Sequence, residues 1–468
     1  MSAVRAVRLI GTAVLLASCS DEQGVGPPPP VAPVIASATV APGPFNVLSA
    51  VVSVRTLNAD SVVVRYRLDG ATATGESATR AVATAGDSAA IPVLGLLPAR
   101  RYLLGVLAYG PGGLADADPL PFTTDTLPSD LPRYTAGGPD PSPGFVVFAA
   151  GRYGLVIDNT GRVVWYRPFA IGPGLNFQVQ RTGRYTVRPP TADPGDIEPW
   201  LELDALGAVT RTFGCLNGLP SRFHDLIAEP DGAYWIMCDE TRTMDLTALG
   251  GVATARVQGT IVQHVSAAGT LLFQWSPFDH FAITDLDSVN RAGPSVNWTH
   301  GNALDLDRDG NLVVSFRSLN EITKIDTRTG AVLWRMGGRR NQFAFETGGL
   351  PAFVGQHGLR LTGQGGLVLL DNLGNATGSR GEAYVYDDST HWARRIAAYE
   401  SSPAVTAPLG GTTQMLPGGR VLVAYGNGGR VEEYDASGQV VWRIEGAPGY
   451  IFRAQRIRSL YQPGSERW

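Results

Sequence analysis

Alternating apolar and polar residues, broken by glycine-bearing turns, dominate the second half of the sequence. Three stretches, residues 223–237, 298–317 and 356–372, share one pattern: a histidine, an alternating run, a Gly-containing turn and a second β-rich run. This pattern predicts two antiparallel strands joined by a tight turn. Side chains at the same phase of a repeated hairpin take equivalent places in each repeat. If the hairpins are arranged radially, His224, His300 and His357 are therefore expected to converge.

A second repeat surrounds these hairpins. Each copy, here called a tag, begins with an apolar residue, which an Asp follows in most copies. A turn ending in Gly and a run containing an aromatic residue come next. The six tags begin at Ile157, Leu203, Val265, Ile325, Tyr386 (a degenerate copy) and Tyr434. No helical pattern separates them, so six units of four strands predict a six-bladed β-propeller. A stacked solenoid is less favoured because the hairpin lengths and turns are those of propeller blades. Each tag then forms the outer hairpin of a blade, and each histidine hairpin an inner one.

Another β-rich region precedes the propeller. Short apolar runs alternate over residues 34–127, and L-G-L-L-P at 94–98, followed by Tyr102 and a closing P-F-T-T, resembles the end of a fibronectin type III domain. The resemblance implies a small antiparallel sandwich with the tyrosine at a corner. This region contains no histidine, so we expect a spacer, scaffold or interface. A Pro-punctuated linker leads to the propeller at 135–468. The predicted fold class is all-β, a six-bladed β-propeller preceded by a small β-sandwich.

Composition and charge narrow the class of protein. Hydrophobic residues make up 44% and charged residues 17% of 468, with 57 glycines and 33 prolines, as in a folded chain with many turns. The formal net charge of −4 provides no broad basic surface, so nucleic acid is not an expected partner.

The N-terminus carries an export signal. Arg5 and Arg8 precede an apolar run at 9–16, and L-A-S-C at 16–19 resembles a bacterial lipobox. The resemblance implies a signal peptide over 1–18, a lipid anchor on Cys19, and a Pro-rich tether over 19–33. A plain secretory signal is the alternative. Ser20 favours the outer membrane, so we expect a lipoprotein at the periplasmic face of a membrane.

Two cysteines remain in the exported body, Cys215 and Cys238. In an oxidising compartment they could form a disulfide, and two buried free thiols are the equally weighted alternative.

The chemistry is expected at one mouth of the central channel, which the innermost strands of a propeller line. Arg317 ends the second strand of its hairpin, and Asn302 lies two residues after His300, on the same face of a regular strand. Imidazoles and a guanidinium suit a tetrahedral oxyanion, and a neutral histidine can act as a nucleophile. Three histidines could also hold a metal, but the adjacent arginine would repel a cation.

A fourth hairpin of the same kind, residues 410–425, carries Thr412 and Thr413 where the others carry histidine. We expect one of these hydroxyls to contact the substrate. His264, His280 and His391 lie outside the inner hairpins and are expected to be structural or surface residues.

Residues 144–456 resemble the bacterial arylsulfate sulfotransferases, periplasmic six-bladed propellers that need no nucleotide sulfate donor. The matching stretches include F-H-D-L, W-T-H-G-N-A-L-D-L-D-R-D-G-N-L-V-V-S-F-R, T-G-A-V-L-W-R-M-G-G, Q-H-G-L, L-D-N-L-G-N and F-R-A-Q-R. The resemblance implies that His357 is the nucleophile that carries a covalent sulfohistidine. It implies that His224, His300 and Arg317 bind the sulfuryl group and that Asn302 helps to position it.

The resemblance also implies the substrates: an aryl sulfate donor and a phenolic acceptor, exchanged by a ping-pong mechanism without metal or cofactor. The fibronectin-like front region departs from the family, which uses a different sandwich for dimerisation, so a homodimer is one candidate assembly. Two other functions were weighed: a propeller quinoprotein dehydrogenase, because Trp-rich blade tags also occur there, and a surface-anchored binding propeller without chemistry.

Overall fold

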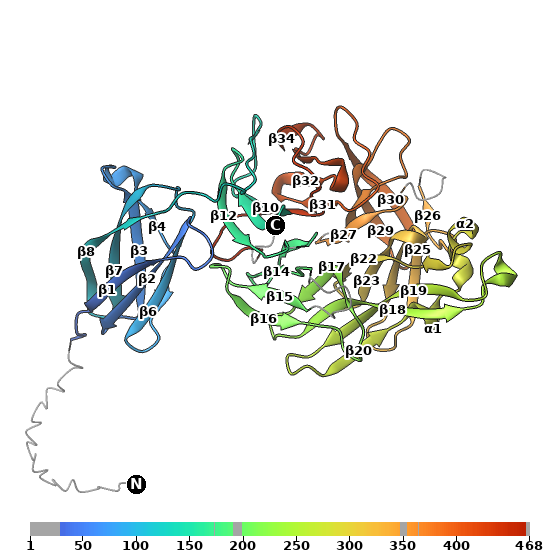
Figure 1. Ribbon diagram of the computed structural model, residues 1–468, viewed down its shortest axis with the longest axis horizontal. Helices are drawn as coiled ribbons and strands as arrows, with labels where there is room; N and C mark the ends of the chain where they lie inside the picture. The colour runs from blue at the N-terminus through green and yellow to red at the C-terminus, as the bar shows by residue number, and fades with distance from the viewer. Residues whose placement is uncertain (1–28, 173, 191–198, 347–352, 364, 465–468) are drawn as a thin grey trace, which may run out of the picture.

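The computed structural model describes residues 29–172, 174–190, 199–346, 353–363 and 365–464. The expected signal peptide over 1–18, the expected lipidation site Cys19 and the tether up to residue 28 lie outside the described residues. Within them the regular structure is almost entirely β, arranged as a sandwich beside a ring of sheets (Figure 1). The predicted fold class is therefore confirmed.

Two antiparallel sheets form the N-terminal sandwich. One sheet has the order β1-β2-β6, and the other has the order β4-β3-β7-β8 with β5 also on β3. The strands are β1 (Val34–Pro42), β2 (Ser49–Leu57), β3 (Ser61–Leu68), β4 (Ser77–Ala78), β5 (Val82–Ala83), β6 (Ser88–Leu94), β7 (Arg101–Gly110) and β8 (Gly113–Thr123). Tyr102 is buried, and its hydroxyl accepts a hydrogen bond from the Leu97 backbone N–H at 2.8 Å. This bond pins the corner before β7, as expected for a tyrosine corner.

The sandwich is joined to the propeller by specific contacts. The Tyr166 hydroxyl accepts a hydrogen bond from the Val47 N–H at 3.2 Å, and the Arg167 guanidinium lies 3.8 Å from the centre of the Phe45 ring. On the C-terminal side, the backbone N–H of Leu94 donates to the Tyr461 hydroxyl at 3.2 Å. Both ends of the propeller sequence therefore hold the sandwich in place.

Six mainly antiparallel sheets form the propeller in the part of the chain that the structure describes. Blade 1 contains β10 (Phe145–Ala150), β11 (Tyr153–Ile157), β12 (Val163–Pro168) and β35 (Ala454–Ile457). Blade 2 contains β13 (Phe177–Val179), β14 (Tyr185–Val187), β15 (Trp200–Leu203) and β16 (Val209–Phe213). Blade 3 contains β17 (Ser221–Ala228), β18 (Tyr234–Met244), β19 (Ala255–Val265), β20 (Leu271–Trp275) and β21 (Ser295–Asn297).

The second half of the ring repeats this arrangement. Blade 4 contains β22 (Gly301–Leu306), β23 (Leu312–Phe316), β24 (Glu321–Ile325) and β25 (Val332–Gly337). Blade 5 contains β27 (His357–Thr362), β28 (Gly366–Asp371), β29 (Arg380–Asp387), β30 (Trp392–Glu400) and β26 (Ala344–Phe345). Blade 6 contains β31 (Thr412–Met415), β32 (Val421–Ala424), β33 (Val431–Tyr434), β34 (Val440–Ile444) and β9 (Ala136–Gly137). Every predicted tag joins the third and fourth strands of a blade.

Strands from the two ends of the propeller sequence close the ring. The C-terminal strand β35 pairs with β10 as the innermost strand of blade 1, and β9 pairs with β34 at the outer edge of blade 6. The helical segments among the described residues are short: α1 (Pro277–His280), α2 (Ser288–Arg291) and the 3-10 turns η1 (Ala73–Gly75), η2 (Thr247–Leu249), η3 (Ile283–Asp285), η4 (Arg317–Leu319), η5 (Pro417–Gly419) and η6 (Gly426–Gly428). No described helix has the length and apolar character to cross a bilayer.

The hydrophobic core of the propeller is divided among the contacts between blades. Each pair of neighbouring blades encloses its own cluster of buried side chains, and the cluster between blades 6 and 1 completes the circle. Tryptophans of the tags, such as Trp165, Trp275, Trp334 and Trp442, are fully buried in these clusters. Because each blade packs on two neighbours, the positions of the innermost strands are set by the whole ring.

Cys215 and Cys238 form a disulfide in the structure, with their Cα atoms 6.0 Å apart. The bond ties the loop before β17 to the middle of β18. The structure therefore has the disulfide and not the two buried free thiols.

Candidate active site

Each of the three predicted histidines sits where the first strand of its blade is irregular. The pairing register shifts between Ser221 and Leu226 in blade 3, between Gly301 and Ala303 in blade 4, and between His357 and Arg360 in blade 5. Such bulges re-aim side chains and are over-represented next to active sites. The corresponding strand of blade 6 pairs regularly, and it carries threonines instead.

The structure brings the three histidines together, as predicted. The ring centres of His224 and His300 are 4.9 Å apart, and those of His300 and His357 are 6.2 Å apart. Arg317, also predicted, acts electrostatically on all three imidazoles and lowers the pKa of each. Burial is the larger cause of each shift, so all three rings are neutral at neutral pH.

The tautomer of His357 is fixed by its partners. Its Nδ1 lies 2.9 Å from the Gly355 carbonyl oxygen and 2.9 Å from Oδ1 of Asn372. The Asn372 amide nitrogen donates to the carbonyls of Ala407 and Gly410, so its oxygen must face the histidine. Two acceptors at Nδ1 require a proton there, which leaves the lone pair of the neutral ring on Nε2.

His224 is fixed in the opposite tautomer. Its Nδ1 accepts a hydrogen bond from Nε of Arg222 at 3.2 Å, and Arg222 is itself held by Asp239 at 2.6 Å. A guanidinium only donates, so Nδ1 of His224 carries the lone pair and Nε2 carries the proton. Burial and the Arg222 charge hold the pKa of His224 well below its usual range. His224 is therefore a neutral N–H donor.

His300 has a different kind of partner. Its Nδ1 lies 2.6 Å from the side-chain nitrogen of Asn297, an exposed residue in β21. Asn297 can present either end of its amide by rotation, so His300 can exchange tautomers where the other two histidines cannot. His300 also has a backbone φ of +48°, an uncommon conformation for a residue other than glycine and one that clusters at functional sites.

Two further predicted residues have buried polar atoms that form no hydrogen bond within the described protein. They are Nε of Arg317 and Oδ1 of Asn302. The Asn302 amide nitrogen donates to the Gln356 carbonyl at 2.6 Å, so this residue links the strand of His300 to the peptide before His357. The prediction that His300 and Asn302 share a face of a regular strand is wrong, because β22 begins at Gly301 and bulges before Ala303.

The hydroxyls of the two threonines have hydrogen-bond partners within the ring. Thr412 donates to the Ala454 carbonyl at 3.3 Å, and Thr413 donates to the Leu369 carbonyl at 2.8 Å. Both hydroxyls thus join blade 6 to its neighbours, and neither has a hydrogen bond to a histidine. They stabilise the ring at the level of the site.

Sequence reasoning missed Arg222, Asp239 and Asn372. A signal for two of them was present: the buried run in the second strand of each inner hairpin is followed by a polar residue, which is Asp239 within β18, Arg317 after β23 and Asn372 after β28. Only Arg317 was recognised. Arg222 carried no such signal, because it precedes its histidine by two residues in an otherwise ordinary strand.

Aromatic side chains border the histidines on one side. The half-buried Phe223 ring stacks on His224 at 4.1 Å between centres, and Phe452 lies 5.8 Å from His224. Tyr450, which is 38% exposed, lies 6.4 Å from Phe452 and interacts electrostatically with Arg317. These three residues form an apolar surface beside the imidazoles, here called the aromatic wall.

One cluster of acidic side chains has the spacing of metal ligands among the described residues. It consists of Asp307, Asp309 and Asp388. The Lys324 ammonium contacts all three, at 2.7, 2.8 and 2.5 Å, so these carboxylates already have a cation. His264 and His280 stack on Trp235 and Trp275, and His391 packs near Phe343.

The shifted pKa of His357 predicts the acid side of the pH profile. Burial lowers this pKa from 6.5 to about 4. Protonation would occupy the Nε2 lone pair, so reactivity of the ring should persist below pH 6.5 and be lost as the pH falls through about 4. The kcat/KM profile of the free enzyme with an aryl sulfate measures this limb. A limb near 6.5 in protein that circular dichroism shows to be folded would contradict it.

One known family matches the part of the chain that contains the histidines. A family model described as arylsulfotransferase (ASST) matches residues 220–447, which include the three histidines, Arg317, Asn302 and Asn372. No curated protein matches the sequence.

Among solved structures, a protein of unknown function from Bacteroides caccae is similar at 12% identity and a TM-score of 0.43, covering 68% of this chain and 100% of that one. A streptogramin B lyase is similar at 14% identity and a TM-score of 0.38, covering 68% and 85%. A regucalcin from Agrobacterium tumefaciens is similar at 18% identity and a TM-score of 0.34, covering 69% and 95%.

The family match covers blades 3 to 5 and nearly all of blade 6, and it includes the three histidines and Arg317. Residues 220–447 match the arylsulfotransferase family, and this match supports an enzyme of the transferase class.

Proposed function

We propose that the protein transfers a sulfuryl group from an aryl sulfate to an acceptor phenol by a ping-pong mechanism with His357 as the nucleophile. The observation that supports this most is the contrast between fixed tautomers. His357 has its lone pair on Nε2 because Nδ1 faces two carbonyl oxygens, whereas His224 has its proton on Nε2 because Nδ1 faces a guanidinium. One ring is thus prepared to attack and the other to donate. The family match favours this function over the quinoprotein dehydrogenase and the binding propeller weighed above.

In the first step, Nε2 of His357 attacks the sulfur of the donor ester. The S–N bond forms, the S–O bond to the aryl group breaks, and the phenolate leaves with the electron pair. Negative charge on the three sulfuryl oxygens is stabilised by Arg317 and by the Nε2–H of His224. Positioned donors of this kind stabilise charge in transition states without reorganising.

In the second step, the oxygen of the acceptor phenol attacks the sulfur and the S–N bond breaks. The proton of the acceptor must leave, and the proposal assigns its removal to His300. Rotation of the Asn297 amide would place a proton on Nδ1 and free Nε2 of His300 to act as the base. Oδ1 of Asn302, an acceptor without a partner among the described residues, can hold the acceptor hydroxyl before its proton passes to His300. Overall, the proton lost by the acceptor matches the one gained by the released phenolate.

The aromatic wall supports an aryl group on both substrates. Phe223, Phe452 and Tyr450 offer ring faces next to the reacting imidazoles, where flat aromatic groups gain stacking and edge contacts. Donor and acceptor would occupy the same surface in turn, as a ping-pong exchange requires.

Initial rates with 4-nitrophenyl sulfate and phenol test this function. Varying both substrates should give parallel double-reciprocal lines, and enzyme mixed with donor alone should release one equivalent of nitrophenol in a burst. Intersecting lines without a burst would mean that both substrates must bind before any product leaves, which contradicts a covalent intermediate.

Asn372 gives a prediction that separates tautomer control from simple packing. Asn372→Ala removes the fixed acceptor at Nδ1 of His357, so kcat should fall by about 10- to 100-fold while KM changes little. The hydrogen bond from His357 to Asn372 raises the pKa of His357, so its loss should also move the acid limb of kcat/KM to lower pH. The pH profile of the variant measures both effects.

Asn375 provides the control. It lies in the same loop, and its exposed amide contacts Thr377 and Glu400 instead of a histidine. Asn375→Ala should therefore leave both kcat and the acid limb unchanged. An unshifted limb in Asn372→Ala would remove Asn372 from the mechanism.

A further inference from the structure

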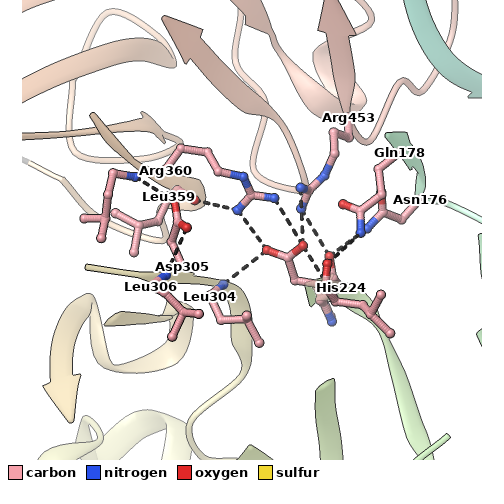
Figure 2. Close-up of polar contacts among 12 residues, drawn as sticks. Asn176, Gln178, His224, Leu304, Asp305, Leu306, Leu359, Arg360 and Arg453 are labelled. Carbon is pink, nitrogen blue, oxygen red and sulfur yellow. Dashed lines mark hydrogen bonds and ion pairs between the residues drawn. The ribbon is translucent and has the colours of Figure 1, made fainter. Parts of the chain in front are cut away.

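A single buried carboxylate connects the strands that carry the three histidines. Asp225 follows His224 directly in β17 and is fully buried. Its oxygens accept hydrogen bonds from the Leu304 N–H at 3.1 Å and from Arg360 at 2.8 and 3.1 Å. The Arg453 guanidinium lies 3.4 Å away on another side. Figure 2 shows the side chains of Arg360 and Arg453 reaching toward one another from the upper left and the upper right.

These partners come from different blades, and two of them lie just beyond a histidine. Leu304 is four residues after His300 in β22, and Arg360 is three residues after His357 in β27. Asp225 itself is one residue after His224. One carboxylate thus contacts all three strands close to the residues that perform the chemistry.

The backbone of His224 is held from its other side as well. Its carbonyl accepts hydrogen bonds from Nη2 of Arg453 at 3.2 Å and from the Asn176 side chain at 2.7 Å. Arg453 lies just before β35 and Asn176 just before β13, so blades 1 and 2 also contribute (Figure 2). His224 and Asp225 together therefore have partners from four other blades.

Backbone pairing does not fix the spacing of the histidines. The innermost strands of neighbouring blades belong to separate sheets, and each bulges at its histidine. The distances between histidines must then be set by side chains that cross from blade to blade. A buried carboxylate is costly unless it is paired and hydrogen-bonded, and here two guanidiniums and backbone N–H groups provide both conditions.

We propose that Asp225 is a positioning residue that sets the spacing of His224, His300 and His357. It does not contact the sulfuryl group in this proposal and acts only through the strands it joins. Its kinetic consequences rest on the proposed function, because they assume that the three histidines act on one substrate.

Asp305 offers a matched control. It is buried, and its carboxylate accepts from the Leu361 N–H at 3.0 Å and from the Leu306 N–H at 2.9 Å. It therefore joins β22 to β27, as Asp225 does, but it makes no described contact with β17. It also lies further along both strands from the histidines.

The experiment compares Asp225→Asn with Asp305→Asn by rapid mixing with 4-nitrophenyl sulfate. Asp225→Asn should lower the rate of the nitrophenol burst by about 100-fold, the scale expected when reacting groups are displaced by about 1 Å, with little change in KM. Asp305→Asn should change the rate by no more than a few fold. Asp225→Asn should have the lower thermal midpoint, because it leaves the buried Arg453 guanidinium without its carboxylate, so both rates are measured well below the midpoints.

Arg360→Met extends the test. It breaks the same link between β17 and β27 from the other end, so Arg360→Met and the double variant Asp225→Asn/Arg360→Met should show nearly the same loss as Asp225→Asn alone. Losses that multiply would mean that the two residues act independently, which would overturn the proposal.

Crystal structures of the two aspartate variants provide a readout without turnover. In Asp225→Asn the ring centres of His224 and His300 should depart from the separation of 4.9 Å, whereas Asp305→Asn should retain it. If the unmodified enzyme transferred no sulfuryl group, the proposed function would fail and this comparison would still decide the positioning role. Unchanged histidine spacing in Asp225→Asn, or the same displacement in both variants, would overturn it.

Discussion

Replacing His357 by alanine is expected to lower the rate of aryl sulfate turnover by about 10⁴-fold or more, the scale seen when a nucleophile is removed from a group of residues that act as a unit. Nε2 of His357 is the ring nitrogen whose lone pair is fixed in place by partners at Nδ1. Neither His224 nor His300 can replace it, because the first has its proton on Nε2 and the second lacks a fixed acceptor at Nδ1. The nitrophenol burst measures the loss.

His280→Ala is the control for this change. His280 stacks on Trp275 at 5.3 Å, outside the group of histidines. Its removal should leave the burst intact. A burst of normal amplitude in His357→Ala would assign the nucleophile to another residue.

Arg317→Met is expected to lower kcat by about 10³-fold, because a positioned cation at the transferring group contributes on this scale. Nε of Arg317 is buried without a hydrogen-bond partner in the described protein, and the charge lies near all three imidazoles. The loss should fall mainly on kcat, since the charge on the sulfuryl oxygens grows in the transition state. Steady-state kinetics with aryl sulfates of differing leaving groups measures it.

The matched control is Arg328→Met in the same blade. Arg328 lies in the tag of blade 4, and its side chain is 86% exposed beside Asp326. Its loss should not change kcat. Equal effects of the two substitutions would mean that Arg317 acts through general charge and not through its place in the site.

Much of the fold could be predicted because its repeats are local. An apolar residue, a Gly-bearing turn and an aromatic run identify a hairpin from neighbouring residues alone, and each of the six tags became the outer hairpin of a blade. The three histidines occupy equivalent positions in their inner hairpins. Because a propeller arranges its blades around one axis, equivalent positions of the innermost strands lie close together, so the sequence predicted that the histidines converge.

The remaining features depend on contacts between blades or on local irregularity. Side chains alternate between the two faces of a regular strand, but the bulge at each histidine and the positive φ of His300 interrupt this alternation. The prediction that His300 and Asn302 share one face was therefore wrong. Arg222, which fixes the tautomer of His224, has no sequence pattern of its own. One threonine hydroxyl was expected to contact the substrate, and the hydrogen bonds that both donate to neighbouring blades were not foreseen.

Asp225 illustrates the same limit. The sequence places it directly after His224, but its role emerges only when Leu304, Arg360 and Arg453 are brought to it by the ring. A residue whose partners lie in three other blades cannot be interpreted from its own strand.

The mass of the intact protein after exposure to 4-nitrophenyl sulfate without acceptor tests the central claim most directly. The account predicts a gain of one sulfuryl group, mapped by peptide fragmentation to His357, that disappears when phenol is added and never forms in His357→Ala. An enzyme that turns over the donor with no mass gain, or with the gain on another residue, would contradict it.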